Sequence, residues 1–219
     1  KYLKLRGEER GISAIAIIAF LTIIISTAAS LLILSAVNGM HIDLLDRIMA
    51  KDAHILVLGP GKGISNYEKY LTNVAAVEGV TDVVPYHDGE VLIKGPNKVW
   101  GAATKAFPRE VYETDPSISN EFPIRSGEYN FEKAHRIVLG SLLATNLGVQ
   151  VGDVIKLIVH SGDFFNMEHP FLVNGIYHSG YSEYDGNLAF ISFSDAQEVF
   201  NAEGYAYGLA IKVEDPENV

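Results

Sequence analysis

Residues 12–37 read ISAIAIIAFLTIIISTAASLLILSAV, a run of 26 residues without a charged side chain. About 20 apolar residues suffice for a helix to cross the ~30 Å hydrocarbon core of a bilayer. Hydroxyl groups in such a run can bond to carbonyl oxygens of their own helix, so they cost little in lipid. A cleaved signal peptide is the alternative, but its apolar core usually spans about 7–15 residues. This run continues well past the small residues Thr27-Ala28-Ala29, where cleavage would occur. We therefore predict a retained transmembrane helix.

The basic residues that flank this run predict its orientation. Lys1, Lys4, Arg6 and Arg10 precede it, whereas Arg47 and Lys51 are the basic residues in the stretch that follows. The flank richer in Lys and Arg stays in the cytoplasm. The N-terminal flank is therefore expected in the cytoplasm, and the large C-terminal part outside it.

Charge and cysteine content exclude two classes of function. The chain has 27 Asp and Glu against 17 Lys and Arg, a net charge of −10, and most of the acidic excess follows the apolar run. An acidic surface repels phosphate backbones, which argues against nucleic-acid binding. The chain contains no cysteine, so neither disulfides nor thiol chemistry contribute, even in an oxidising compartment.

A helical pattern continues beyond the apolar run. Ile42, Leu45 and Met49 recur at helical spacing opposite a charged face. A continuous helix over residues 12–51 would be about 60 Å long, so about half of it would extend beyond the hydrocarbon core. Residues 1–51 are therefore expected to form a cytoplasmic flank, a transmembrane helix and a stalk.

The residues after the stalk begin with a predicted β-α-β unit. It has a strand at 53–58, a helix capped by Ser65 with Glu68 at the capping-box position, and a strand at 80–85. A second unit ends the chain, with strands at 188–193 and 205–213 and, between them, a helix at 194–201.

An insert separates these units, and it is expected to be mainly β. Its predicted elements are strands at 91–94, 99–105, 137–139, 154–160 and 171–177, with one helix at 141–147 that ends at Gly148. The outer domain, 52–219, is therefore predicted to be α+β. It would have a split β-α-β sheet lobe, 52–87 and 181–219, and an inserted mainly-β lobe, 88–180.

Several motifs that suggest chemistry do not have the required spacing. Gly59-Pro60-Gly61-Lys62-Gly63 follows a strand, but a phosphate-binding loop needs four residues between its glycines and a Ser or Thr after the lysine. We interpret this segment as a turn. The sequence thus predicts no catalytic residue and no cofactor.

The histidines also favour a structural interpretation. They lie at positions 41, 54, 87, 135, 160, 169 and 178, without zinc-ligand spacing. The fold could still bring His160, His169 and His178 together, but no metal site is predicted. His160-Ser161 and His178-Ser179 resemble nucleophile–base pairs. Adjacent side chains at a strand end point to opposite sides, so both pairs are expected to be strand-ending turns.

Two groups of residues are candidates for contacts with other proteins. Small side chains share one face of the apolar helix and would let a second helix approach closely, although membrane helices are rich in small residues anyway. They are Ala19, Thr22, Ser26, Ala29 and Ser30. Phe164, Phe165 and Met167 lie in the connection 161–170 between two predicted strands. They either form an exposed apolar tip that binds a partner or fold back onto the core of the insert.

Two phrases give the chain a resemblance to a known family. The first is ISAIAI at 12–17, leading to LSAVNGM at 34–40; the second is IVLGSLLA at 137–144 followed by LGVQVGD at 147–153. Together they resemble the permease subunits of the lipoprotein-releasing ABC system, within the wider class of mechanotransmission ABC permeases. The resemblance covers nearly the whole chain.

This resemblance implies a fold and a set of partners. Family members have four membrane helices with a large periplasmic domain between the first two, so the chain would be helix 1 and that domain. The location implied is the bacterial inner membrane. The implied partners are a cytoplasmic ABC ATPase subunit, a second permease subunit that is identical or homologous, and the lipoprotein cargo. ATP-driven closure of the ATPase would move the stalks and release the lipoprotein.

A periplasmic lipoprotein chaperone is a further partner in the family. One family member recruits it with a protruding hairpin in the region that corresponds to Ser161–Pro170. This connection is short here, which leaves the chaperone an open partner. The chain would then be the partner-type subunit or a homodimeric version. A single-pass membrane receptor or sensor with an outer ligand-binding domain is the alternative function.

The stalk leads to a testable prediction at Gly39. A continuous helix transmits displacement along its axis, whereas a break would absorb it. Gly39→Ala should therefore preserve lipoprotein release, since Ala favours a helix by about 1 kcal/mol over Gly. Gly39→Pro removes a backbone hydrogen bond and clashes with the preceding turn, so it should abolish release while the partner still hydrolyses ATP. Both activities would be measured in reconstituted vesicles; full release by the proline variant would rule out a rigid stalk.

Overall fold

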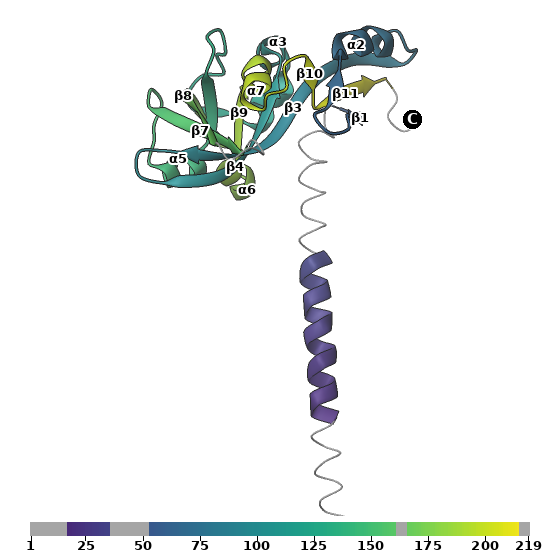
Figure 1. The fold of residues 1–219 in the computed structure, drawn as a ribbon, viewed down its shortest axis with the longest axis vertical. Coiled ribbons are helices and arrows are strands. Elements are labelled where there is room, and N and C mark those ends of the chain that lie inside the picture. Colours follow the sequence, from purple (N-terminus) through teal and green to yellow (C-terminus); the bar gives the residue numbers. More distant parts are fainter. Residues whose placement is uncertain (1–16, 36–52, 161–165, 215–219) are drawn as a thin grey trace, which may run out of the picture. The chain divides into compact units, whose positions relative to one another are not determined.

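The computed structural model describes residues 17–35, 53–160 and 166–214. The chain divides into two compact units, residues 1–50 and 51–219. In the first unit, Ile17–Ser35 is an α-helix that is long and apolar enough to cross a membrane (Figure 1). All its side chains are exposed. The predicted helix is thus present over these residues, whereas the predicted stalk and Gly39 lie outside the described residues.

The second unit is organised around a mixed nine-stranded sheet in the order β1-β11-β3-β4-β9-β6-β8-β5, with β7 paired to β3 and β8. Its strands are β1 (Ile55–Leu58), β3 (Val80–Lys94), β4 (Val99–Phe107), β5 (Ile124–Gly127), β6 (Arg136–Gly140), β7 (Val154–His160), β8 (Asn166–Tyr177), β9 (Leu188–Ser192) and β11 (Gly208–Val213). Two short strands, β2 (Ile64–Ser65) and β10 (Tyr205–Ala206), form a separate pair. The β4–β9 and β6–β8 pairs are parallel, and all others are antiparallel. The predicted α+β class is confirmed.

The helices of this unit are short. They are α2 (Tyr67–Ala75), α3 (Arg109–Thr114), α4 (Pro116–Glu121), α5 (Ser141–Leu147), α6 (Ser182–Asn187) and α7 (Phe193–Val199). The sequence predicted α2, α5 and α7, whereas α3, α4 and α6 were missed. Each of these three has six residues, too few for a helical period to show in the sequence.

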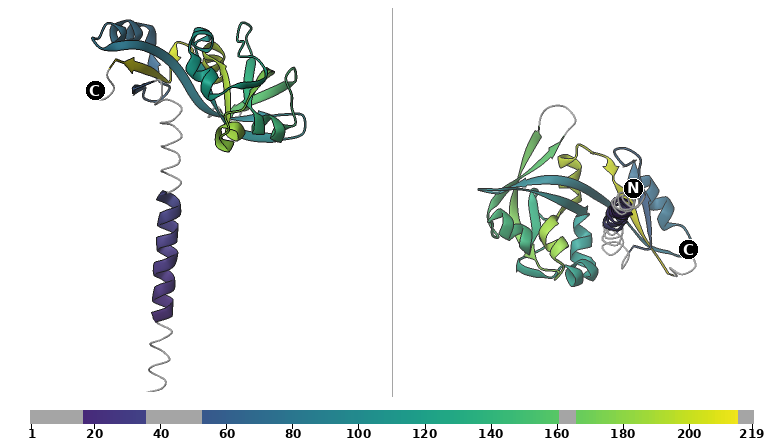
Figure 2. Two further views of the ribbon diagram at one scale, coloured as in Figure 1. Left: turned by 180° about the vertical axis from the view of Figure 1, so that it is seen from behind. Right: turned by 90° about the horizontal axis from the view of Figure 1, so that it is seen from below.

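Strand β3 connects the two ends of the sheet. Its first half pairs with β11 as far as Tyr86, and from His87 onward it pairs with β4 and then also with β7. The ribbon views show β3 as one long curved strand that runs from the α2 and β11 end to the β7 and β8 end (Figures 1 and 2). It is continuous through residues 87 and 88, where the boundary between the two lobes was expected. The division into lobes stays a prediction.

The first β-α-β unit forms as expected, except at the start of its helix. Ser65 was predicted to cap α2, but it belongs to β2 and pairs with Tyr205 of β10. Asn66 takes the cap position instead, in the left-handed conformation with φ 50° and without a side-chain cap bond. The capping-box prediction was therefore wrong, because a pairing partner some 140 residues away draws Ser65 into a strand.

The second β-α-β unit also matches the prediction, with small shifts. Helix α7 begins at Phe193, because the Ser192 hydroxyl accepts a hydrogen bond from the Asp195 amide at 3.1 Å and caps the helix. The single strand predicted over 205–213 is divided into β10 and β11. β11 lies between β1 and β3, so its backbone is paired on both sides.

The main core lies in the predicted insert and along β9 and α7. It includes Ile137 and Leu139 of β6, Leu143 and Leu147 of α5, and Ala196 of α7, all essentially inaccessible to solvent. Apolar burial of this kind is worth roughly 25 cal/mol per Å². In contrast, α2 has no buried residue, and neither does β1. This end of the sheet is therefore the least covered part of the unit.

The sequence stretches IVLGSLLA, 137–144, and LGVQVGD, 147–153, lie at a tightly packed junction. The Asp185 carbonyl oxygen of α6 lies 2.4 Å from where a Cβ on Gly140 would be, so only glycine fits there. Leu143, Ala144 and Leu147 point into the core. Gly148 ends α5 in the left-handed conformation with φ 72°, as predicted. Packing and helix termination thus explain the residue types in these two stretches.

We predict that Gly140→Ala destabilises the outer domain by about 1–3 kcal/mol, since the added methyl must displace the α6 backbone. Gly186→Ala is the matched control. Its Cβ would meet nothing closer than 4.0 Å, so its effect should stay within about 1 kcal/mol. Urea denaturation followed by fluorescence of Trp100, the one tryptophan, measures both. Equal stability of the two variants would contradict the packing explanation.

Candidate functional site

The small face of the N-terminal helix is exposed along its length. Ala19, Thr22, Ser26, Ala29 and Ser30 are all accessible. The Thr22 hydroxyl donates to the Ile18 carbonyl at 2.8 Å, and the Ser30 hydroxyl to the Ser26 carbonyl at 3.0 Å. These polar groups are satisfied within the helix, so they add little cost in lipid. Whether a second helix packs here stays a prediction.

The candidate partner loop is only partly described. Phe164 and Phe165 lie outside the described residues. Met167 lies near the start of β8 opposite Val159 of β7, with 53% of its surface exposed. β7 and β8 form an antiparallel pair, as predicted for the strands on either side of this connection. An exposed methionine beside the connection is compatible with a partner site, which stays a prediction.

The glycine-rich segment at 59–63 closes on itself. The Gly63 amide donates to the Pro60 carbonyl at 3.1 Å, and the Lys62 ammonium donates to the Asn201 carbonyl at 3.4 Å. A Cβ on Gly63 would lie 2.2 Å from the Ala206 carbonyl oxygen. The segment is the turn that its composition indicated, and its lysine contacts the protein itself.

Two histidines of the described residues share one carboxylate, whereas His87 contacts the Tyr205 carbonyl instead. Glu198 of α7 lies 3.3 Å from His135 and 3.7 Å from His169. Within residues 17–35, 53–160 and 166–214, no group of three or more His, Asp or Glu side chains is arranged to hold a metal ion. Glu198 therefore serves to link α7 to β8 and to the residue before β6.

The side-chain types of a hydrolase triad lie close together at Ser141, His178 and Asp185. The His178 Nδ1 lies 2.7 Å from the buried Asp185 carboxylate and 3.1 Å from the Ser141 hydroxyl. In a working triad the two ring nitrogens divide these roles, one facing the acid and the other the nucleophile. Here both contacts use Nδ1, and a nitrogen that donates its proton to Asp185 cannot also accept one from Ser141, so the arrangement differs from a triad.

The same cluster explains the His178-Ser179 turn. Asp185 accepts hydrogen bonds from the Ser179 amide at 2.8 Å and from the Ser179 hydroxyl at 2.9 Å. These bonds satisfy a carboxylate that is only 1% exposed, which a buried charge requires. The cluster joins α6 to the end of β8. The second His-Ser pair is thus a strand-ending turn, as predicted, and the first reaches outside the described residues.

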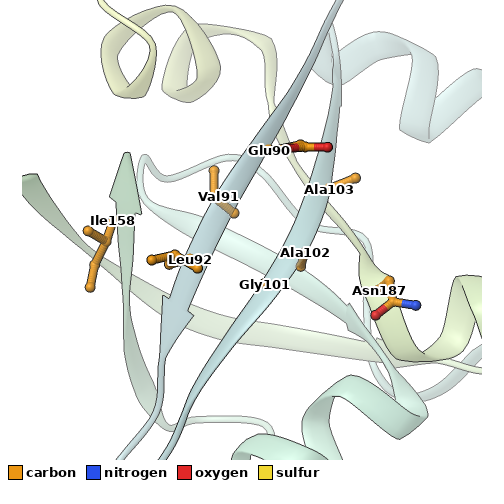
Figure 3. Close-up of a pocket in the computed structure, with 8 residues that line it drawn as sticks. All are labelled: Glu90, Val91, Leu92, Gly101, Ala102, Ala103, Ile158 and Asn187. Atoms are coloured by element: carbon orange, nitrogen blue, oxygen red, sulfur yellow. The ribbon is translucent and has the colours of Figure 1, made fainter. Parts of the chain in front are cut away.

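An open groove lies along β3 and β4 and has a volume of about 680 Å³. Figure 3 shows side chains from three strands and from the end of α6 around it. They are Glu90, Val91, Leu92, Gly101, Ala102, Ala103, Ile158 and Asn187. Asn187 already accepts a hydrogen bond from the Trp100 ring at 3.4 Å. Most of these lining residues are apolar or small, with Glu90 and Asn187 as the polar members.

One buried ion pair was not anticipated from the sequence. Lys105 of β4 is 2% exposed and its ammonium lies 3.6 Å from the Asp88 carboxylate, directly across the β3–β4 ladder. Burial lowers the pKa of Lys105, and Asp88 opposes this shift. The pair lies where β3 leaves β11 and begins to pair with β4. Its position indicates a structural role at this junction.

The comparisons with known proteins show the family of this chain. The model of the family described as MacB-like periplasmic core domain matches residues 16–219. The "Lipoprotein-releasing system transmembrane protein LolC" of Xylella fastidiosa (strain Temecula1) is 24% identical over 98% of this chain and 53% of the relative. "Lipoprotein-releasing system transmembrane protein LolE" of Haemophilus influenzae is 29% identical over 70% of this chain and 38% of the relative. The chain spans about half the length of the curated LolC relatives that it matches.

Solved structures share the fold of the outer domain. The extracellular domain of the noncanonic ABC-type transporter YknZ from Gram-positive bacteria matches with a TM-score of 0.52 and 11% identity, over 73% of this chain and 82% of that one. The periplasmic region of MacB from Actinobacillus actinomycetemcomitans matches with a TM-score of 0.50 and 12% identity, over 73% of each. The resemblance seen in the sequence is therefore confirmed: the chain belongs to the MacB-like periplasmic core domain family and is a homologue of the LolC and LolE permeases.

Proposed function

We propose that this chain is part of a permease subunit of an ABC transporter in the bacterial inner membrane, and that it acts in releasing lipoproteins from that membrane. One observation carries this proposal. The LolC relatives align with nearly the whole chain, and the family model with residues 16–219, so the likeness includes the apolar helix as well as the outer domain. No feature of the described residues favours a receptor or sensor over this function.

The sheet supports a mechanical role for the outer domain. β1 is the first strand after the segment expected to form the stalk, and it pairs with β11. β11 pairs with β3, and β3 pairs with β4 and β7. Backbone hydrogen bonds of this kind resist stretching, so a displacement applied at β1 would reach the far end of the sheet. Motion produced at a cytoplasmic ATPase would thereby act on a lipoprotein at the periplasmic face of the inner membrane.

ATP hydrolysis would belong to a separate subunit. The Gly59–Gly63 segment does not have the spacing of a phosphate-binding loop, and its lysine contacts the Asn201 carbonyl. In the complex we propose, the partners are a cytoplasmic ABC ATPase, a second permease chain and the lipoprotein cargo. A periplasmic chaperone that accepts the cargo stays an open partner, because the 161–170 connection is short.

The test is reconstitution of the complete gene product with its ATPase partner in vesicles that contain a labelled lipoprotein. We expect ATP-dependent transfer of the lipoprotein to the soluble fraction when a periplasmic acceptor is present. Vesicles with the ATPase alone should hydrolyse ATP without transfer, and the permease alone should do neither. Retention of the lipoprotein by the complete complex, with ATP hydrolysis intact, would contradict lipoprotein release as the function.

Assembly of this complex should depend on the small face of the helix. Ser26→Leu or Ser30→Leu adds bulk where we propose that a neighbouring helix packs, so each should reduce co-purification of the partner subunits. A loss of about 1–2 kcal/mol corresponds to roughly tenfold. Ala28→Leu is the matched control, because Ala28 lies about 200° around the helix from either serine. Equal assembly by all three variants would refute the packing face.

A further inference from the structure

Strand β1 ends the nine-stranded sheet and is unusually open for such a strand. It pairs with β11 on one side, and no other described strand pairs with it on the other. Its residues are Ile55-Leu56-Val57-Leu58, and the last three are 39%, 39% and 59% exposed. An apolar strand with a free backbone edge is a template for pairing with another strand.

The opposite end of the sheet shows how this protein protects an edge. β5 carries the exposed Arg125, follows Pro123 and contains a register shift between Ile124 and Ser126. Gly127 at its end has φ 76°. A charge, a proline and an irregular ladder are the usual means of preventing edge pairing. β1 has none of these over residues 55–58, so its open edge is consistent with a partner.

The hydrogen bonds of β1 show which of its backbone groups are free. The Gly59 amide donates to the Tyr207 carbonyl at 3.1 Å, and these two residues continue the β1–β11 register. In an antiparallel ladder, alternate residues direct their N–H and C=O toward the same neighbour. Ile55, Val57 and Gly59 therefore face β11. Leu56 and Leu58 direct their backbone groups outward.

The order of residues around Val57 makes this edge self-complementary. In an antiparallel pairing of β1 with a second β1, Leu56 of each chain would lie opposite Leu58 of the other. The outward N–H and C=O groups of these leucines would then form hydrogen-bonded pairs. Val57 would meet its own equivalent on the two-fold axis. All contacts over 56–58 would be apolar, and no like charges would face each other.

We infer that β1 is the docking edge for a second copy of this chain, paired antiparallel about Val57, so that the sheets of two outer domains join into one. This rests on the part of the proposed function that places two permease chains in one complex. Such a pairing is isologous, as closed two-fold dimers require.

The anchoring of the chain favours a second copy over a soluble partner. The described part of the membrane helix ends at Ser35, and 19 residues, 36–54, separate it from β1. Two copies held in one membrane would present their β1 strands through segments of equal length. Confinement to one membrane raises the local concentration of one edge near the other. A short interface that would be weak in solution is then sufficient.

The absence of cysteine from this chain permits a test by disulfide cross-linking in membranes. Val57→Cys would place two sulfurs at a non-hydrogen-bonded pair, where Cα atoms are about 4.5 Å apart, within disulfide range. Leu56→Cys is the matched control, equally exposed on the same strand. Its equivalents would be diagonal neighbours at about 7–8 Å, beyond that range. Mild oxidation should therefore give at least roughly fivefold more covalent dimer with Val57→Cys.

Two differently tagged copies, expressed together, separate this inference from the proposed function. If the copies co-purify and Val57→Cys cross-links in preference to Leu56→Cys, the β1 pairing holds. If they co-purify but the two variants cross-link equally or not at all, the β1 pairing is wrong and a permease pair formed through other surfaces stands. If the copies do not co-purify while lipoprotein release persists, the second copy is wrong and the proposed function survives. The chain without substitutions contains no cysteine, so it is the negative control for covalent dimer formed on oxidation.

Discussion

The continuity of β3 is the constraint on which the rest of the outer domain depends. This 15-residue strand pairs with β11 over its first half and with β4 and β7 over its second half. If it broke near His87, the lightly covered end with β1 and α2 would lose the backbone ladder that joins it to the main core, and the chain from α7 to β11 would be left as the connection. The buried Lys105–Asp88 pair lies at this crossing. A buried ion pair adds little net stability, but breaking it would leave a charge without a partner at the junction.

The family phrase around Gly140 is a packing motif in this structure. Gly140 accommodates the backbone of α6, and α6 is also anchored by a side chain at the end of the preceding strand. The Tyr177 hydroxyl lies 2.8 Å from the Tyr184 carbonyl and 3.0 Å from that of Leu188. Burial raises the pKa of Tyr177, so this side chain stays a neutral donor at physiological pH. These residues therefore identify the fold of the outer domain through its packing.

The candidate sites of this protein are surfaces suited to contact with other polypeptides. The Ser141–His178–Asp185 cluster has the chemical groups of a hydrolase and the wrong geometry, since one imidazole nitrogen makes both contacts. The groove along β3 and β4 is apolar and open. The exposed features of the described residues include the small face of the N-terminal helix, Met167 near the start of β8, and the edge of β1. Each is suited to contact with another polypeptide, as expected of one subunit in a larger machine.

The sequence alone determined the elements whose signals are local. The apolar helix follows from its uncharged run, and β7 and α5 form at the predicted residues because alternation, helical spacing and a terminal glycine act within a few positions. The two β-α-β units and the α+β class followed from their order. Tertiary structure decided the rest. Ser65 joins a strand through Tyr205, and α6 packs its backbone against Gly140 of β6. β3 crosses the expected lobe boundary because strands remote in sequence pair with both halves. These features depend on contacts between residues far apart along the chain, and such contacts leave no periodic signal in a single sequence.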